Sequence, residues 1–343
     1  MKSRTTIQDV AKKAMVSKVT VSYVLNGRDA DVRISQETRA RVLQAAEELG
    51  YRPSGVARML VNQRSGTIAV VFQYASYFSH WSSFTSDVMR GVCEAAVVEG
   101  FDLMLHTKAT ETVDQELNQL LDGRVDGALV LRDGNDPMVQ QLINRGFPFV
   151  LFFTRNYDPR ACFVDSDNYM GGQIATDHLI KLGHRRIGMV RGSHQSTSSN
   201  DRFNGYRDAL ESNGIACRED HVLAIPTPDS PLGGLDDLMA RPDRPTAFFI
   251  WSDDVAYPVM GRLKELGFEC PRDVSIVGFD SLPSSELCSP RLTSVKQAIE
   301  EIARAATQML VARINGEDIR QRQQIFPLTL DIRSSTGPAP DLT

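Results

Sequence analysis

The sequence predicts a small all-α N-terminal domain joined by a linker to a larger α/β body of two lobes, each a doubly wound parallel sheet. Two patterns predict this fold class. Short capped amphipathic helical segments fill the first 50 residues, whereas from Thr67 onwards apolar strand segments alternate with amphipathic helical ones. The alternation runs through the chain twice, which is typical of two parallel sheets covered on both faces by helices. The length of 343 residues also exceeds what one ordinary core supports.

Composition bounds the class of protein. The hydrophobic fraction of 42% and the charged fraction of 24% are those of a globular protein. The sequence contains no run of 18 apolar residues, so we expect no membrane span. The chain starts without the apolar core of a signal peptide, so we expect a cytoplasmic protein with no membrane partner. Its five cysteines are scattered and form no Cys-x-x-Cys pair, which favours reduced, mostly buried thiols over a disulfide framework or a zinc site.

Charge is divided unevenly along the chain. Residues 1–64 contain 12 Lys and Arg against 6 Asp and Glu, which gives this part a net charge of +6. The whole chain has a net charge of −5, so the remaining residues together carry a charge of −11. A basic N-terminal domain is what contacts with nucleic-acid phosphates require, and an acidic body discourages further wrapping by DNA.

Residues 6–26 predict two short helices that meet at a tight turn. Thr6 can cap the first helix, with Asp9 in its first turn, and Ser17 can cap the second. The second helix keeps one apolar face, formed by Val21, Val24 and Leu25. Two helices of this size and spacing form a helix-turn-helix, which places its second helix in the DNA major groove. Capping and apolar spacing alone also fit an ordinary helical hairpin.

The N-terminal domain is expected to end at about residue 50. A third helix begins after Ser35 and runs to about Leu49, with Val42 and Leu43 among its inward residues, and Gly50 ends it. Residues 51–66 then form a short hinge helix and a polar linker, because the helical pattern at 51–60 is too short to be stable alone.

The body is expected at residues 67–336. Strands are predicted at 67–72, 102–106, 127–131 and 149–153 in the first set, and at 186–190, 222–225, 247–251 and 275–279 in the second. Helices are predicted near 84–99, 113–121, 136–145, 169–182, 202–213, 232–240, 254–266 and 297–314.

The literal string of residues 6–26, TIQDVAKKAMVSKVTVSYVLN, resembles the headpiece of the lactose-repressor and purine-repressor (LacI/GalR-type) family of bacterial transcriptional regulators. The resemblance implies a body of the periplasmic-binding-protein type I, for effector binding and dimerisation, in which the chain crosses between the lobes three times. We place the crossings near 162–167, 290–295 and 324–327. The first lobe then comprises about 67–163 and 295–325, and the second about 164–293 and 327–336.

The same resemblance implies which residues contact DNA. Lys18, Val19 and Tyr23 match the positions that reach base edges. Lysine can donate to guanine O6 or N7, and valine can contact the thymine methyl group. A solvated Lys18 and a packed Tyr23 are the alternative. The remaining predicted DNA-binding residues are the caps Thr6 and Ser17, the phosphate-contacting or structural positions Thr20, Ser22 and Asn26, and Arg58 and Leu60 of the hinge.

The hinge and the turn each carry a notable residue. Leu60 matches the family's leucine that enters the minor groove as a wedge at the operator centre and needs a partner leucine from a second subunit. A core position is the alternative for Leu60. Met15 stands where the family's turn nearly always has glycine, and if the backbone there needs a positive φ, methionine costs on the order of 1 kcal/mol. Gly55 weakens the hinge helix by about the same amount.

Ligands of two-lobed α/β proteins bind where the carboxyl ends of both sheets face each other. Arg202, which we expect to open a helix, and Asp280, which follows a strand, match the family's ligand-gripping pair. Carboxylate accepts hydrogen bonds from hydroxyl groups and guanidinium donates to them. The other predicted effector-binding residues are Tyr77, Phe78, Phe153 and Ser252. The alternatives are an Arg202–Asp280 ion pair that closes the lobes, and core packing for each aromatic residue.

These patterns predict a ligand-responsive repressor that binds a palindromic operator in double-stranded DNA as a homodimer. A small sugar is the first expectation for the effector; a purine or another metabolite acting as corepressor is the alternative. A sugar-binding transport protein is much less expected, because the signal peptide is missing and the headpiece is present. The sequence shows no His-Glu-x-x-His, P-loop or Gly-x-Ser-x-Gly motif and no metal-ligand spacing, so we expect no enzyme, cofactor or metal. The tail has no heptad helix for tetramers.

Overall fold

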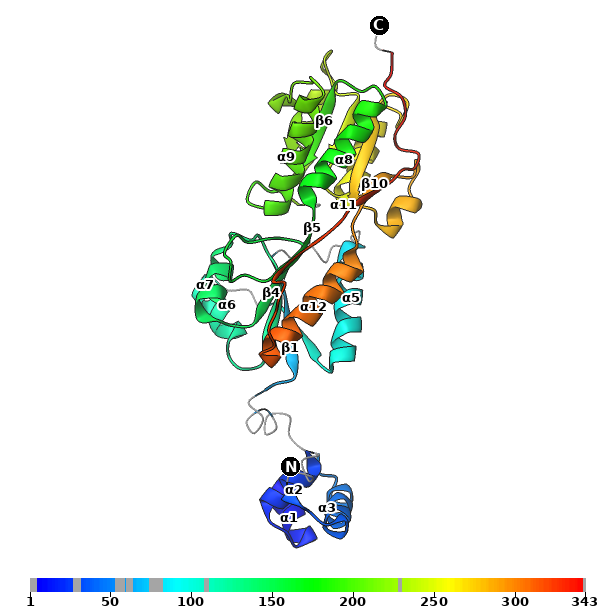
Figure 1. Ribbon diagram of the computed structural model, residues 1–343. Coiled ribbons are helices and arrows are strands. Elements are labelled where there is room, and N and C mark those ends of the chain that lie inside the picture. Colours follow the sequence, from blue (N-terminus) through cyan, green and yellow to red (C-terminus); the bar gives the residue numbers. More distant parts are fainter. Residues whose placement is uncertain are drawn as a thin grey trace. The chain divides into compact units, whose positions relative to one another are not determined.

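The computed structural model describes residues 5–26, 32–52, 59, 64–73, 83–107, 111–227 and 230–341 (Figure 1). The chain divides into an N-terminal unit that ends at Gly66 and a body that begins at Thr67. Several residues singled out above lie outside the described ones: Gly55, Arg58, Leu60, Tyr77 and Phe78.

Within residues 5–26 and 32–52 the N-terminal unit has three helices, α1 (Ile7–Ala14), α2 (Lys18–Leu25) and α3 (Gln36–Glu48). The predicted caps Ser17 and Ser35 are confirmed, since each hydroxyl accepts from the backbone N–H three residues later. At α1 the Asp9 carboxylate accepts from the Thr6 N–H at 2.9 Å and from its hydroxyl at 2.7 Å. These hydrogen bonds lower the pKa of Asp9.

A small core of buried valine and alanine side chains joins the three helices. On α3 the inward residues are Val42, Ala45 and Ala46, spaced three and four apart as one helix face requires. The prediction that Leu43 points inward is wrong. Leu43 is 46% exposed, because it lies one residue, or about 100°, away from Val42 around the helix.

The first lobe of the body is built on one six-stranded parallel sheet with the order β11-β5-β4-β3-β1-β2. Its strands are β1 (Thr67–Phe72), β2 (Asp102–His106), β3 (Gly127–Leu131), β4 (Phe149–Phe152), β5 (Phe163–Ser166) and β11 (Gln323–Phe326). Its helices are α5 (Phe84–Glu99), α6 (Val113–Leu120), α7 (Pro137–Arg145) and α12 (Ile299–Asn315). In Figure 1, α5 and α12 lie on one side of this sheet and α6 and α7 on the other.

The second lobe repeats this arrangement around the order β12-β10-β9-β8-β6-β7. Its strands are β6 (Ile187–Arg191), β7 (Val222–Ala224), β8 (Ala247–Ile250), β9 (Ser275–Asp280), β10 (Thr293–Lys296) and β12 (Thr329–Asp331), and β12 is antiparallel to β10. Its helices are α8 (Asn168–Lys181), α9 (Thr197–Ser212), α10 (Leu235–Met239) and α11 (Asp253–Glu265), with 3-10 turns η3 (Glu219–His221) and η4 (Pro283–Glu286).

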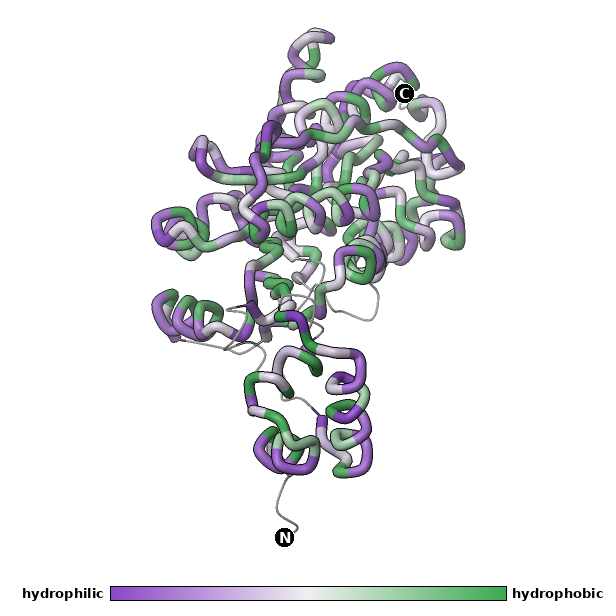
Figure 2. Tube along the Cα trace, turned by 60° about the horizontal axis from the view of Figure 1, so that its bottom comes forward, coloured by the Kyte–Doolittle hydropathy of each residue, from purple (hydrophilic) through white to green (hydrophobic). Residues whose placement is uncertain are grey.

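Both faces of the second sheet are buried, as the near-continuous apolar strands predict. Along β8, Phe248 packs with residues of α10 and α11, whereas the next residue, Phe249, packs with residues of α8 and α9. Figure 2 shows hydrophobic segments running through the interior of the body and hydrophilic ones at its outer turns. The predicted class of two doubly wound parallel lobes with a small helical headpiece is therefore confirmed.

The second crossing comes later than predicted, and the predicted end of the first lobe at residue 163 is too early. β5 pairs with β4 and β11, so residues 164–166 belong to the first lobe and the chain leaves it only before α8. β10 pairs with β9, so residues 295–296 belong to the second lobe and the crossing lies at 297–298. The apolar pattern continues through both strands, and only the pairing partner shows which sheet each one joins. The third crossing follows β11 at Pro327–Leu328.

Two local predictions are also corrected. Arg202 does not open its helix: α9 begins at Thr197, because the Ser196 hydroxyl caps it by accepting from Ser199 N–H at 3.3 Å. The serine-rich run therefore starts a helix, although serine usually competes with helical hydrogen bonds. The five cysteines are free thiols, but only Cys162 is buried and Cys93 is exposed. No helix among the described ranges is long and apolar enough to cross a membrane.

Met15, in the turn between α1 and α2, has φ 53° and ψ 47°, which is the left-handed region. Its side chain is 80% exposed, so no buried contact compensates the backbone cost. We predict that Met15→Gly stabilises the headpiece of the full-length protein by about 1 kcal/mol. Amide hydrogen exchange of the buried α1 and α2 residues measures the change. Lys13→Gly, in the last turn of α1, is the matched control and should destabilise the headpiece. The strain argument is contradicted if exchange becomes slower in Lys13→Gly, or if it does not become slower in Met15→Gly.

Candidate functional site

The helix-turn-helix presents the start of α2 to solvent. Lys18 and Val19 are exposed, and the valine side chain is 61% exposed, while Val21 and Val24 of the same helix are buried in the headpiece core. An exposed cation beside an exposed methyl pair at the N-terminus of the second helix suits contacts with base edges in the major groove.

The other predicted DNA-binding residues lie along the same segment. Thr6 and Ser17 are exposed, and Thr20, Ser22, Tyr23 and Asn26 are half-buried. The Ser17 and Thr20 hydroxyls lie 2.9 Å apart, and the Asn26 amide donates to the Ser22 hydroxyl at 3.2 Å. The helix therefore fixes these side chains in relation to one another, and their contacts with DNA stay a prediction.

A cavity lies between the two lobes of the body, at the carboxyl ends of both sheets. Four predicted effector-binding residues line it: Phe153, Arg202, Ser252 and Asp280. The structure thus brings together the predicted residues that it describes. The sequence reasoning missed the following lining residues: Phe84, Leu131 and Asp133 from the first lobe, Gly192, Ser193, Ser196, Ser198, Ser199, Pro226, Thr227, Trp251 and Asp254 from the second, and Gln297 at a crossing.

Arg202 is held rigidly inside the second lobe. Its Nε donates to the Asn168 side-chain oxygen at 2.8 Å, one terminal nitrogen donates to the Trp251 carbonyl, and its guanidinium lies 3.5 Å over the Phe279 ring. The helix that carries it packs very closely on α8. A Cβ on Gly172 would lie 2.1 Å from the Arg202 carbonyl oxygen, so only glycine fits there.

Asp280, at the end of β9, is buried and has a left-handed backbone with φ 112°. The Ser252 hydroxyl donates to one of its carboxylate oxygens at 3.2 Å, and the Gln297 amide donates to the other. Burial raises the pKa of Asp280 to about 8, although Arg202 acts in the opposite direction. Because Arg202 and Asp280 both belong to the second lobe, an ion pair between them cannot close the lobes, and that alternative is wrong.

A second buried carboxylate, Asp253, supports the loop after Asp280. It accepts from the Ser294 hydroxyl at 2.6 Å, and from the Leu282 N–H and the Ser285 hydroxyl at 2.8 Å each. Burial raises its pKa to about 6. A Cβ on Gly278 would lie 2.2 Å from the Asp253 carboxylate, so β9 needs glycine at this point.

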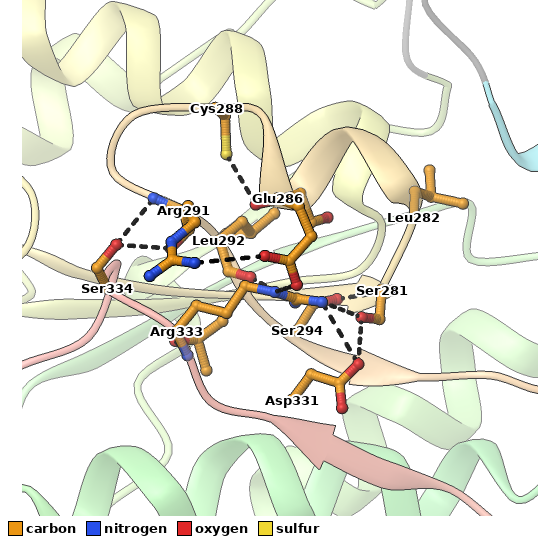
Figure 3. A network of polar contacts seen from close by, with 12 residues as sticks. Ser281, Leu282, Glu286, Cys288, Arg291, Leu292, Ser294, Asp331, Arg333 and Ser334 are labelled. Carbon is orange, nitrogen blue, oxygen red and sulfur yellow. Dashed lines mark hydrogen bonds and ion pairs between the residues drawn. The ribbon is translucent and has the colours of Figure 1, made fainter.

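The polar network of Figure 3 ties the same loop to the last strand of the body. Arg333, following β12, donates to the Ser281 hydroxyl at 2.9 Å, to the Leu292 carbonyl at 2.8 Å and to Glu286 of η4 at 2.5 Å. The Ser281 hydroxyl in turn donates to Asp331 at 2.7 Å. Ser281, which directly follows the predicted ligand-binding residue Asp280, is therefore anchored to β12 and to the residues after it.

Direct polar contacts join the two lobes at one side of the cavity. The Thr154 and Thr197 hydroxyls lie 3.0 Å apart, and the Ser198 hydroxyl donates to the Phe153 carbonyl at 2.9 Å. Arg155 of the first lobe forms an ion pair with Asp201 of α9 at 3.2 Å. The same arginine donates to Asp165 of β5 at 3.3 Å, next to the first crossing.

Phe153 also carries backbone strain. Its φ of 58° lies in the left-handed region, which is costly for an aromatic residue. Its ring packs edge-on against Phe84 at 5.0 Å between centroids. Strained residues of this kind persist only where the surrounding structure holds them, and here two of them, Phe153 and Asp280, line one cavity.

One group of side chains in the second lobe has the spacing of metal ligands, namely Asp220, His221 and Asp243. Both of its carboxylates form ion pairs with the guanidinium groups of Arg218 and Arg241. Two arginine charges already neutralise the group, so it is unsuited to a metal cation.

Comparison with known proteins identifies the two parts of the chain. A model of the bacterial regulatory proteins of the lacI family matches residues 6–54, and a periplasmic binding protein-like domain matches residues 176–336. The transcriptional regulator CelR of Thermobifida fusca is 34% identical over 97% of this chain and 98% of its own. This chain belongs to the lacI family. It is a transcriptional regulator, and its relatives are regulators rather than enzymes.

Solved structures of lacI-family proteins share its fold. A CelR–cellobiose complex matches with a TM-score of 0.73 and 33% identity over 97% of this chain and all of the other. The Lac repressor dimer bound to operator and an anti-inducer matches with a TM-score of 0.83 over 98% of this chain and all of the other, at 24% identity.

The raised pKa of Asp280 predicts how stability depends on pH. A carboxyl group that binds its proton more tightly in the folded than in the unfolded state lowers stability increasingly as pH rises towards its folded pKa. Asp280→Asn removes this cost while keeping the shape, so we predict a free energy of unfolding at least about 1 kcal/mol above wild type at pH 7.5.

This stability gain should be largest near pH 8 and should shrink as pH falls towards 4, because the wild-type carboxyl then becomes protonated in the unfolded state as well as in the folded state. Calorimetric unfolding of the full-length protein across this range measures the gain. Asp237→Asn, at an exposed position of α10, serves as the control. A less stable Asp280→Asn protein at pH 7.5 contradicts the prediction.

Proposed function

We propose that this regulator is a repressor that binds a palindromic operator as a homodimer and responds to a small carbohydrate bound between its lobes. One observation carries the proposal: a single chain holds a helix with base-reading side chains exposed at its start and an interlobe cavity lined by polar groups suited to hydroxyls. Asp280 and the serine hydroxyls can exchange hydrogen bonds with a sugar, and Trp251 and Phe153 offer apolar faces to its ring.

The relatives support a sugar, because one solved structure of similar sequence is described as a cellobiose complex. A purine or another metabolite remains the second candidate, since aromatic side chains also suit a base. A dimer fits the proposed palindromic operator, which would take two headpieces. Large apolar side chains also remain on the surface of the body: Val97, Val98 and Leu287 are each at least 80% exposed. Operator binding would place the protein in the cytoplasm.

Electrophoretic mobility shift of the DNA upstream of the protein's own gene, with and without candidate sugars, tests this function. A specific complex whose amount changes with one neutral sugar supports it. Specific DNA binding that no small molecule alters contradicts control by a ligand.

Base reading by α2 makes a separate prediction. Replacing Lys18, Val19 and Tyr23 together by alanine should relax the preference at a few half-site positions, each lost base contact costing about 1–3 kcal/mol. Selection of preferred sites from a random DNA library measures this. Lys12→Ala, an exposed lysine of α1, is the control and should leave the preferred sequence unchanged. If the triple variant selects the wild-type sequence, α2 does not read the bases.

The roles of cavity and hinge are separable. Arg202→Ala should keep operator affinity without effector but lose the response to it, because the guanidinium positions the ligand and does not touch DNA.

Leu60→Ala should bind effector normally and bind the operator more weakly, because the wedge in the minor groove is lost. Calorimetry with the active sugar, together with mobility shifts, measures both. An Arg202→Ala protein that responds at the wild-type effector concentration contradicts this placement of the ligand.

A further inference from the structure

The interlobe cavity contains an excess of negative charge. Asp133, Asp254 and Asp280 line it, and Arg202 is the cationic side chain among the described residues that do so. Asp280 and Arg202 are close enough for the guanidinium to lower the pKa of the carboxyl group. Because the pKa of Asp280 is raised to about 8, its carboxyl group is largely neutral at pH 7. Arg202 then offsets one of the carboxylates of Asp133 and Asp254, and one negative charge is left.

Asp133 comes from the first lobe, just after β3, and lines the cavity together with Ser196 at the N-terminus of α9 in the second lobe. Its backbone N–H donates to the Gln73 side-chain oxygen at 2.8 Å, and the Gln73 amide donates to its carboxylate at 3.3 Å. Burial raises the pKa of this carboxyl group, and the hydroxyl of Ser196, the N-cap of α9, lies near enough to act in the opposite direction. A helix N-terminus is the place in such a cavity that favours an anion. At α9 this chain supplies the anion itself.

Asp254 likewise places a carboxylate at the N-terminus of α11, which also begins at the cavity. It lies in the first turn of α11, its N–H donates to the Ser252 hydroxyl at 3.3 Å, and it is 7% exposed. The negative charge of Asp254 contributes to the raised pKa of Asp280, so these two carboxyl groups of the cavity lining repel each other. The N-termini of α9 and α11 are therefore already supplied with carboxylates.

Arg202 is also poorly placed to hold a free anion. Two of its N–H groups bond Asn168 and the Trp251 carbonyl, and one face of its guanidinium covers the Phe279 ring. Phosphate and carboxylate ligands are normally bound by two parallel N–H donors of one guanidinium. The bonds within this chain hold the arginine in a different orientation.

From this arrangement we infer that the effector site selects neutral polyhydroxyl ligands and rejects their anionic derivatives, such as sugar phosphates and sugar acids, with Asp133 and Asp254 as the residues that reject them. The inference rests on the proposed function and deepens it. Sugar hydroxyls donate to carboxylates, so the same two residues that repel an anion favour a neutral sugar.

Inorganic phosphate tests the charge selection without knowledge of the effector. Phosphate stabilises most proteins more than chloride does, because it is excluded from their surface. At equal ionic strength, the full-length wild-type protein should therefore show no thermal stabilisation by phosphate beyond that of the control variant below. The double variant Asp133→Asn/Asp254→Asn should be stabilised by phosphate, because the helix N-termini then lack their own anions. Asp114→Asn, an exposed carboxylate of the first lobe, is the matched control and should behave as wild type. Specific stabilisation of the wild type by phosphate overturns the inference.

Matched pairs of sugars test it directly by calorimetry. The pairs are glucose and glucose 6-phosphate, ribose and ribose 5-phosphate, and cellobiose and cellobionate. For any pair with a neutral member that binds, the anionic member should bind at least about tenfold more weakly, and the difference should shrink in the double variant and at high salt. An anionic member that binds as tightly as its neutral partner overturns the charge selection and leaves the proposed function intact. DNA binding that responds to no small molecule contradicts the proposed function instead.

Discussion

The buried carboxylate of Asp253 is the interaction on which the candidate ligand site depends. A buried charge is tolerated only when hydrogen bonds satisfy it, and here two hydroxyls and a backbone N–H do so. These donors come from β10 and from the loop after β9, whereas the acceptor begins α11. One side chain thus joins the pieces that hold Asp280 in a left-handed backbone conformation, which would otherwise cost on the order of 1–3 kcal/mol.

Asp280 is in turn connected to the segments about which the lobes can move. The Gln297 amide donates to it from the second crossing, and the Gln297 oxygen accepts from the Ser166 hydroxyl, at 2.6 Å, beside the first crossing. Ser281 links the same region to β12, after the third crossing, through Asp331. A ligand that changes the hydrogen bonds of Asp280 therefore acts on residues at all three crossings, and this is the kind of contact through which a ligand can bias the angle between two domains.

The sequence predicted those features that local chemistry determines. Ser17 and Ser35 follow capping rules, Met15 occupies a turn that demands a positive φ, and Arg202 and Asp280 stand in recognisable motifs. It did not predict Asp133, Asp254 or Arg155. Asp133 and Arg155 act through partners in the other lobe, far away in the chain, which only strand order and lobe closure bring near. Asp254 lies beside the predicted Ser252, but its part in the cavity's charge depends on the surrounding carboxylates.

The polar contacts between the lobes bear on how the proposed small ligand could control so large a molecule. Among the described residues around the cavity they include two side-chain hydrogen bonds and the Arg155–Asp201 ion pair. A hydrogen bond of this kind contributes about 0.5–1.5 kcal/mol net, and an ion pair that is partly open to solvent contributes no more. Coupling energies between a ligand and a distant site are typically about 1–3 kcal/mol. The two quantities are of similar size, so a sugar that bridges the lobes needs only a few differential hydrogen bonds to change the balance between their arrangements.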